Sequence, residues 1–402
     1  MPKITTWILL CGLATVGAGQ SVIFSVLPPL GRQIGMPDYQ VALIFTLAAI
    51  AFMVSAPYWG RKSDEWGRKK MIAFGFLGYA VSTGFFGLFG DLGRFSVITA
   101  TSAFLLMTFA RLCYALLSSG VFPAVQAAIA ESTGDENRSS AMASIQAAYG
   151  IGMIGGPGIA SLLVVISITL PLYVSAAISA VAGILVLAIM PETPKVKSAD
   201  KAKIKLKLTD PRIFFLLLTG FAYFIALSGL FQLAAFRYQD LFELTPELAA
   251  AQTSIGFVCS AVATILTQLL IIGRLRLAPA NQIVIGLITG ASTFFLMTLP
   301  EYVWQMHALF VLFGLSTGLM TTGFNTAVTL AVDNDELGAV SGLAAGTQAA
   351  GYVVGPLLSA LLYQMAAEMP FQLFALLLGL FCVFVMLCWK RIPEQPQHSA
   401  AQ

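Results

Sequence analysis

Two stretches of this sequence, DENRSSAMASIQAAYGIGMIGGPGIASLLV (135–164) and DELGAVSGLAAGTQAAGYVVGPLLSALLY (335–363), carry the clearest sign of its architecture. Each starts with Asp-Glu, continues through Gly and Ala, and reaches a Gly-Pro pair, at an offset of 199–200 residues. A repeat of this length indicates two parallel halves related by a pseudo-two-fold axis, with a binding site where the halves meet.

The chain around these stretches is strongly apolar. Of its 402 residues, 58% are hydrophobic and 10% are charged, whereas soluble domains carry about 25% charged residues. The apolar residues form blocks of about 20, the length that a helix needs to cross a bilayer. We predict twelve spanning helices, near 5–30, 40–59, 70–90, 103–130, 139–166, 170–190, 212–237, 249–273, 281–299, 303–331, 338–365 and 370–389.

The fold class that follows is an all-α polytopic membrane protein, with twelve transmembrane helices in two pseudo-symmetric six-helix bundles. A Pro-opened, Lys-rich segment between the two sets of spans has the composition of a linker. We expect an N-terminal bundle at 1–191, a cytoplasmic linker at 192–211, a C-terminal bundle at 212–391 and a cytoplasmic tail at 392–402.

The distribution of basic residues predicts the orientation. With a cytoplasmic N-terminus, 18 of the 22 Lys and Arg residues fall in inner loops, which follows the positive-inside rule. We therefore expect both termini to be cytoplasmic, in a plasma (inner) membrane protein. The first apolar run also has features of a signal peptide, but it continues past Gln20 to Leu30, so we expect a membrane helix there.

The spacing of the cysteines and the lack of a nucleotide-binding motif predict that the protein has no cofactor. All five cysteines lie inside apolar runs without the spacing of metal ligands, so we expect them to pack as small apolar side chains. No GxxxxGK[ST] segment occurs, which argues against a nucleotide site. We expect no metal and no cofactor. We expect the proton gradient, and not a bound nucleotide, to supply the energy for the protein's activity.

The Gly-Pro segments predict close helix packing. Small residues let membrane helices approach to backbone contact, and we expect this of Gly155 as well as of the glycines named below. Gly/Pro-interrupted helices at corresponding positions also point towards a substrate site, so packing and hinge motion are both compatible with the pattern. The predicted packing and hinge residues are Gly152, Gly156, Pro157, Gly351, Gly355 and Pro356.

The loop GRKSDEWGRKK (60–70) joins the second and third predicted spans. Its two glycines suit a tight turn, and Asp64 is an acid close to the end of the second span. This loop resembles the signature Gly-x-x-x-Asp-x-x-Gly-Arg-Lys/Arg of the major facilitator superfamily, with matches at Gly60, Asp64, Gly67, Arg68 and Lys69.

Two further motifs extend that resemblance over the whole chain. Arg111 lies where the family's fourth-helix arginine motif falls, and 152–157 is similar to the fifth-helix Gly-Pro motif of its proton-driven exporters. The chain therefore resembles the drug:proton antiporter branch of the twelve-helix type. It departs from the family at Gln20, which stands where the first helix usually carries an acid.

The resemblance implies a gate at this loop. It implies that Asp64 faces the helix end near Gly338, that Arg68 pairs with Glu131, and that the cluster holds an outward-open state. Plain positive-inside anchoring is the alternative, and it requires only the basic residues. The gating residues that the resemblance implies are Gly60, Asp64, Gly67, Arg68 and Glu131.

Arg111 lies inside an apolar run from Val97 to Ala130. A guanidinium stays charged in a protein and costs about 2.5–3.5 kcal/mol at the centre of a bilayer. All 19 acidic residues fall in loops or at helix ends, so no mid-span carboxylate is available to it. Three roles remain open: binding an anionic group of the substrate, organising water and backbone acceptors for proton coupling, or snorkelling to the outer surface.

Isolated polar residues within the spans predict a cavity. Each alone could be a hydrogen bond between helices, but their concentration in spans one, four, five, seven, ten and eleven favours a shared lining, to which Phe24 adds an apolar wall. His307 either titrates near neutral pH or is a structural hydrogen bonder. The predicted cavity residues are Gln20, Phe24, Arg111, Tyr114, Gln146, Tyr149, Gln232, His307, Asn325, Gln348 and Tyr352.

Together these features predict a secondary active transporter, and not an enzyme, that exports small organic molecules by alternating access. The substrate is either an amphipathic drug-like molecule or an anionic metabolite such as a carboxylate-type siderophore, which Arg111 would suit. A membrane-embedded enzyme would need catalytic pairs inside the spans, and the sequence shows none. We expect a monomer in the lipid bilayer with a small-molecule substrate and no nucleic-acid partner.

Overall fold

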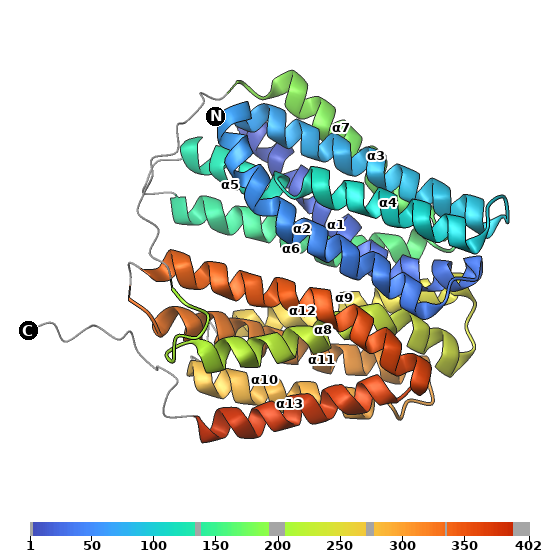
Figure 1. Ribbon diagram of the computed structural model, residues 1–402, viewed down its shortest axis with the longest axis vertical. Helices are drawn as coiled ribbons and strands as arrows, with labels where there is room; N and C mark the ends of the chain where they lie inside the picture. The colour runs from blue at the N-terminus through green and yellow to red at the C-terminus, as the bar shows by residue number, and fades with distance from the viewer. Residues whose placement is uncertain (1–2, 133–137, 193–205, 271–276, 334–335, 389–402) are drawn as a thin grey trace, which may run out of the picture. The chain divides into compact units, whose positions relative to one another are not determined.

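The computed structural model describes residues 3–132, 138–192, 206–270, 277–333 and 336–388 (Figure 1). Every regular element in these ranges is an α-helix, which confirms the predicted all-α class. The helices are α1 (Lys3–Ile34), α2 (Asp38–Trp66), α3 (Arg68–Arg94), α4 (Ala100–Ser118), α5 (Val121–Ser132), α6 (Arg138–Leu163), α7 (Leu170–Ile189), α8 (Phe214–Phe242), α9 (Pro246–Leu270), α10 (Pro279–Leu296), α11 (Val303–Leu330), α12 (Leu337–Met365) and α13 (Met369–Leu387).

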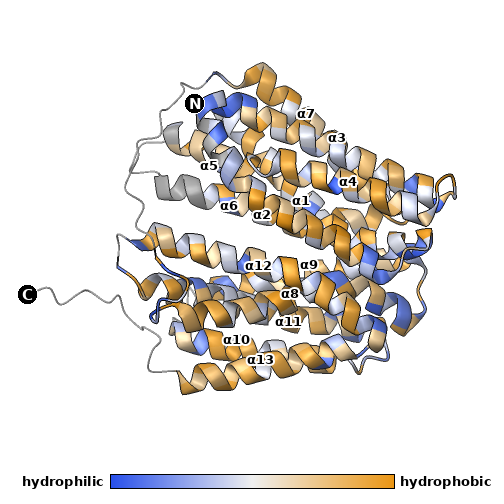
Figure 2. Ribbon diagram, viewed as in Figure 1, coloured by the Kyte–Doolittle hydropathy of each residue, from blue (hydrophilic) through white to orange (hydrophobic). Residues whose placement is uncertain are grey.

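Hydrophobic residues run along these helices, as the sequence predicts (Figure 2). Within the described ranges, 11 helical segments are long and apolar enough to cross a membrane. The helix α6 occupies the remaining predicted position, near 139–166. The helix α8 runs further than predicted, to Phe242, because the acidic residue Asp240 continues the helix instead of starting a loop.

The fourth predicted span, 103–130, consists of two helices, α4 and α5, which a turn at Gly120 separates. Pro123 has no N–H with which to continue the helical ladder across this turn. Hydrogen bonding resumes where the Ala124 N–H donates to the Gly120 carbonyl oxygen at 3.0 Å. A Cβ at Gly120 would lie 2.7 Å from the Trp59 Cβ, so the turn requires a residue without a side chain.

The chain divides into two compact units. Unit 1 comprises 1–199 with 234–255, and unit 2 comprises 200–233 with 256–402. Each unit has a buried aromatic core, formed around Phe76 in unit 1 and around Phe294 in unit 2. Unit 1 takes in the end of α8 and the start of α9, which the predicted boundaries assign to the second bundle. Those boundaries stay a prediction.

Close approach between α1 and α6 holds unit 1 together. A Cβ on Gly152 would lie 1.9 Å from the Ala14 carbonyl oxygen, and one on Gly156 would lie 2.6 Å from the Ala18 Cα. The two backbones are therefore in direct contact, which only small residues permit. Nothing lies within 4 Å of a Cβ at Gly155, so the expectation that Gly155 serves close packing is wrong.

Unit 2 contains a similar contact between α8 and α12. A Cβ on Gly355 would lie 2.0 Å from the Ser228 Oγ. The Ser228 hydroxyl donates to the Gly351 carbonyl oxygen at 2.9 Å. Pro157 and Pro356 lie inside α6 and α12, one residue after the close-packed glycines. The two Gly-Pro segments therefore pack in corresponding ways, each within its own unit.

Candidate functional site

Arg111 lies in α4 and is buried in unit 1, with 7% of its surface exposed. Its Nη2 donates to the Gln20 Oε1 on α1, and its Cζ lies 4.3 Å from the centre of the Tyr114 ring. The Nε has no hydrogen-bond partner among the described residues. An amide and an aromatic face thus hold the charge in the interior. This burial does not agree with the snorkelling role.

The tyrosine beside the Arg111 charge belongs to a group of aromatic contacts. The Tyr114 ring faces the guanidinium and meets the Tyr79 ring edge to face, with centres 5.5 Å apart. Tyr149 meets Phe122 edge to face, also with ring centres 5.5 Å apart. A Cβ on Gly19 would lie 1.5 Å from the Tyr79 hydroxyl, so α1 brings its bare backbone against this ring. The sequence reasoning missed Tyr79, although a tyrosine inside an apolar span is the same signal that indicated Tyr114.

The structure also shows the surroundings of two other predicted cavity residues of unit 1. Phe24 stacks on Phe45, with ring centres 4.7 Å apart and planes 3° from parallel. The Gln146 side chain is exposed. The group that the structure brings together on α1 and α4 is Gln20, Arg111 and Tyr114, to which Tyr79 is added.

The predicted cavity residues of unit 2 differ in burial. Asn325 and Gln348 are exposed, and His307 and Tyr352 are partly buried. Gln232 on α8 is fully buried, and neither atom of its amide has a partner among the described residues. An unpaired buried amide costs about 1–3 kcal/mol. Gln232 is therefore the side chain of unit 2 with the strongest reason to bind a polar ligand group or water.

The loop after α2 has the predicted turn. Gly67 separates α2 from α3 with φ of 91°, where glycine avoids the strain of a side chain. The Arg68 Nη1 donates to the Ser63 Oγ at 2.5 Å. The side chains of Asp64 and Glu131 lie outside the described part of the structure. The implied pair of Arg68 with Glu131 and the gating position of Asp64 therefore stay predictions.

A second arginine, Arg32 near the end of α1, binds two carboxylates within unit 1. Its Nε and Nη2 donate to Asp38 at 2.9 and 2.8 Å, and its Nη1 and Nη2 donate to Asp240 at 2.5 and 3.0 Å. The Cζ lies 4.3 Å from the centre of the Phe236 ring. Paired hydrogen bonds of this kind fix geometry as well as charge. They join α1 and α2 to the end of α8.

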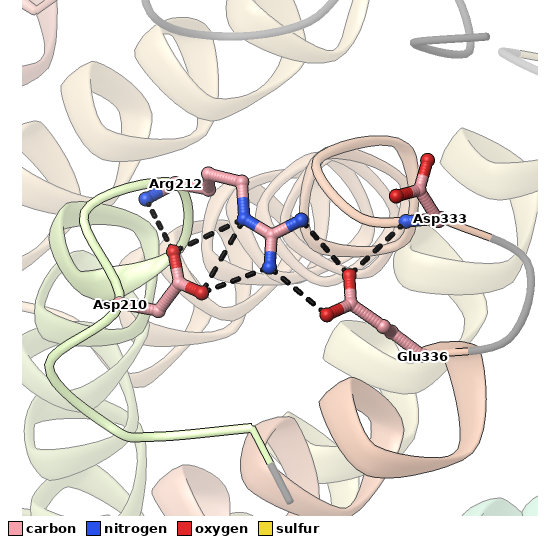
Figure 3. A network of polar contacts seen from close by, with 4 residues as sticks. All are labelled: Asp210, Arg212, Asp333 and Glu336. Carbon is pink, nitrogen blue, oxygen red and sulfur yellow. Dashed lines mark hydrogen bonds and ion pairs between the residues drawn. The ribbon is translucent and has the colours of Figure 1, made fainter. Parts of the chain in front are cut away.

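Figure 3 shows a polar network of unit 2 in which Arg212 lies between Asp210 and Glu336. The Nη2 donates to the Asp210 Oδ2 at 2.9 Å, and the Nη1 donates to the Glu336 Oε2 at 2.9 Å. The Asp333 N–H donates to the same Glu336 oxygen at 3.3 Å. The hydrogen bonds from Arg212 lower the pKa of Asp210 and the pKa of Glu336, and they raise the pKa of Arg212. The network joins the segment before α8 to the start of α12.

This network predicts a pH-dependent contribution to stability. Because the folded protein lowers both carboxyl pKa values, the contribution is complete above their ordinary values, about 4, and disappears as pH falls through the lowered ones. Arg212→Gln should cost about 1 kcal/mol at pH 7, and its melting temperature should approach that of the wild type at an acidic pH at which both carboxyl groups are protonated. Thermal unfolding in detergent measures this, with Lys207→Gln as control. An equal deficit at both pH values would contradict the role of the network.

The fold defines a class of protein: a polytopic, all-helical membrane protein. Long apolar helices form two units, and unit 1 keeps a charged guanidinium in its interior without a described carboxylate beside it. The chain belongs to the Major Facilitator Superfamily, whose sequence profile matches residues 9–259 and 244–402. This membership confirms the prediction of a secondary transporter of small molecules, as opposed to an enzyme.

Individual comparisons agree with this assignment. The chain is 26% identical over 408 residues to Multidrug resistance protein 2 of Bacillus subtilis (strain 168), a match that covers 98% of this chain and 96% of that protein. It is 23% identical over 374 residues to the class C tetracycline resistance protein of Escherichia coli, with 90% of each chain covered. A bacterial homologue of the human lysosomal transporter Spinster, solved in an inward-facing and unoccupied conformation, has the same fold, with a TM-score of 0.77, 14% identity and 100% of both chains covered.

Proposed function

We propose that this transporter exports small organic molecules across the plasma membrane, with the proton gradient as energy source and alternating access as mechanism. The names of two relatives, a multidrug resistance protein and a tetracycline resistance protein, support export. The observation that carries the proposal is the buried Arg111, held by Gln20 and Tyr114 and bordered by Tyr79. We further propose that the protein acts as a monomer with both termini in the cytoplasm.

The charge at this site favours a substrate with an anionic group. The Arg111 Nε is buried without a partner among the described residues, and a guanidinium offers five N–H donors in a planar fork that fits a carboxylate. The surrounding tyrosine rings provide an apolar wall. The unpaired donor therefore favours an anionic metabolite such as a carboxylate-type siderophore, and an amphipathic drug is the second candidate, which the names of the relatives favour.

Transport by the purified protein tests the function. In proteoliposomes with an imposed pH gradient, we expect uptake into inside-acidic vesicles of either tetracycline or a citrate-based chelator, and loss of uptake when an ionophore collapses the gradient. Uptake of the chelator with no uptake of tetracycline would select the anionic substrate. If a broad panel of both classes is not transported at any gradient, the export proposal fails.

The gate that the resemblance implies predicts a strong effect at Asp64. Asp64→Asn removes one of the two acids, and the one at the signature position, from a loop with five basic residues. We expect at least a tenfold loss of proton-driven uptake with normal insertion. Flux per milligram of reconstituted protein measures this. Lys207→Gln, which removes one exposed charge in unit 2, should keep full flux. Unchanged flux in Asp64→Asn would leave anchoring as the role of the loop.

A further inference from the structure

Four aromatic rings form one cluster where α2 ends and α3 begins. The Trp59 ring centre lies 5.2 Å from that of Tyr58, 5.5 Å from that of Trp66 and 5.6 Å from that of Phe74. Trp66 and Phe74 also meet edge to face, at 6.1 Å and 83°. Lys62 lies beside the Trp66 ring, and Lys69 and Lys70 lie between Trp66 and Phe74 in the sequence. We name the four aromatic residues and these three lysines the aromatic–lysine patch.

The rings lie around the connection between two apolar spans, where hydropathy predicts the membrane boundary, and they are open to their surroundings. The apolar span of α2 ends at Trp59, and the next span starts at Arg68. Tyr58 is 54% exposed, Trp66 41% and Phe74 37%. Trp and Tyr are enriched at this depth, where the ring contacts acyl chains and the polar edge contacts head groups.

A hydrogen bond to another helix holds one ring of the patch in place. The Trp59 Nε1 donates to the Leu116 carbonyl oxygen of α4, so this indole is anchored across two helices. Gly120 leaves room for it, since a Cβ there would lie 2.7 Å from the Trp59 Cβ. The outer rings therefore pack on an immobilised tryptophan, which reduces the entropy that a ligand would lose by ordering them.

The positive charge of the patch exceeds its described negative charge. Lys62 pairs with Glu65 at 2.7 Å and lies 5.8 Å from the centre of the Trp66 ring. Lys69 and the exposed Lys70 follow in the first turn of α3, a turn without an acidic residue. The helix dipole gives the N-terminus of α3 a partial positive charge, which repels these lysines. A bound anion would reduce this repulsion.

We propose that the aromatic–lysine patch binds an anionic phospholipid of the phosphatidylglycerol type. The lysines bind the phosphate, and the exposed rings of Tyr58, Trp66 and Phe74 pack against the glycerol and the upper acyl chain. Free phosphate would contact the lysines alone and would leave the rings uncovered. The combination of both surfaces at one membrane boundary selects a lipid.

Lipid titration of the purified full-length protein tests this. Native mass spectrometry from detergent micelles should show phosphatidylglycerol binding at least tenfold more tightly than phosphatidylcholine. Lys70→Gln should weaken phosphatidylglycerol binding about fivefold, which corresponds to about 1 kcal/mol for one charge at the membrane surface. Trp66→Leu should weaken binding of both lipids by a similar factor, because it removes ring contact and keeps the charge.

Matched controls separate this patch from general lipid contact. Lys207→Gln removes an exposed lysine of unit 2, and Trp304→Leu removes a tryptophan that is 66% exposed at the start of α11; both should bind like the wild type. Phe74→Leu replaces Trp66→Leu if the latter does not purify as a monodisperse species. Equal affinity for the two lipids, or equal losses in patch and control variants, would overturn the proposal.

Discussion

Arg111→Ala is expected to weaken binding of the transported anion by about 10- to 150-fold, because a charge-assisted hydrogen bond contributes about 1.5–3 kcal/mol. Arg111→Lys keeps the charge and loses the planar fork, so its loss should be smaller. The Gln20 amide and the Tyr114 ring position the guanidinium. A lysine ammonium can make each of these contacts, but it cannot offer a carboxylate two parallel N–H groups at the same time. Isothermal titration of the purified variants measures the two affinities.

Flux assays on the same variants separate binding from coupling. If Arg111 contacts the substrate, affinity and flux should fall together. If it organises water for proton coupling, affinity should survive while proton-driven flux is lost. Arg94→Ala is the control, because Arg94 pairs with Asp91 at the end of α3. Unchanged binding and unchanged flux in Arg111→Ala would remove the anionic site from this position.

Gly156→Leu should prevent the normal packing of unit 1. A Cβ at this position would lie 2.5 Å from the Ala18 carbonyl oxygen and 2.7 Å from the Ser21 Oγ, and three further carbons would follow it. Backbone atoms cannot move aside as a flexible side chain can. We expect destabilisation of about 3 kcal/mol or more, at the upper end for overpacked sites, seen as a lower melting temperature and aggregation in detergent.

The neighbouring glycine provides the control for this experiment. Gly155 faces a groove lined by residues of α1, α6 and α7, and nothing lies within 4 Å of a Cβ there. Gly155→Leu therefore places the same side chain in the same helix with open space at its Cβ, and it should purify like the wild type. If Gly155→Leu and Gly156→Leu are equally stable, α1 and α6 do not pack through backbone contact.

The helical architecture could be predicted because hydropathy acts over whole spans. A block of about 20 apolar residues has only one low-energy arrangement in a bilayer, since a helix satisfies its own backbone. The helix boundaries that differ from the prediction depend on individual residues. Pro123 and Gly120 divide a span that is apolar apart from Arg111, and Asp240 lies inside α8 although its charge suggested a loop.

The polar contacts were less predictable because they depend on the rotation of each helix. The sequence identified Gln20, Arg111 and Tyr114 as polar residues in spans, and the structure shows that they touch. It gave no reason to pair Arg32 with Asp240, which lies 208 residues away. In the same way Gly155 and Gly156 are identical in sequence terms, and only the helix face distinguishes them.

The backbone contact between α1 and α6 restricts how these two helices can slide. Gly152 fits against Ala14, and Gly156 fits against Ala18, one helical turn further on. A displacement smaller than a full turn, about 5.4 Å, would push side chains into the opposing carbonyl oxygens. The two helices are therefore expected to move together as one rigid body. When this body tilts, Gln20 on α1 and Tyr149 on α6 keep the same relative position along the helix axes.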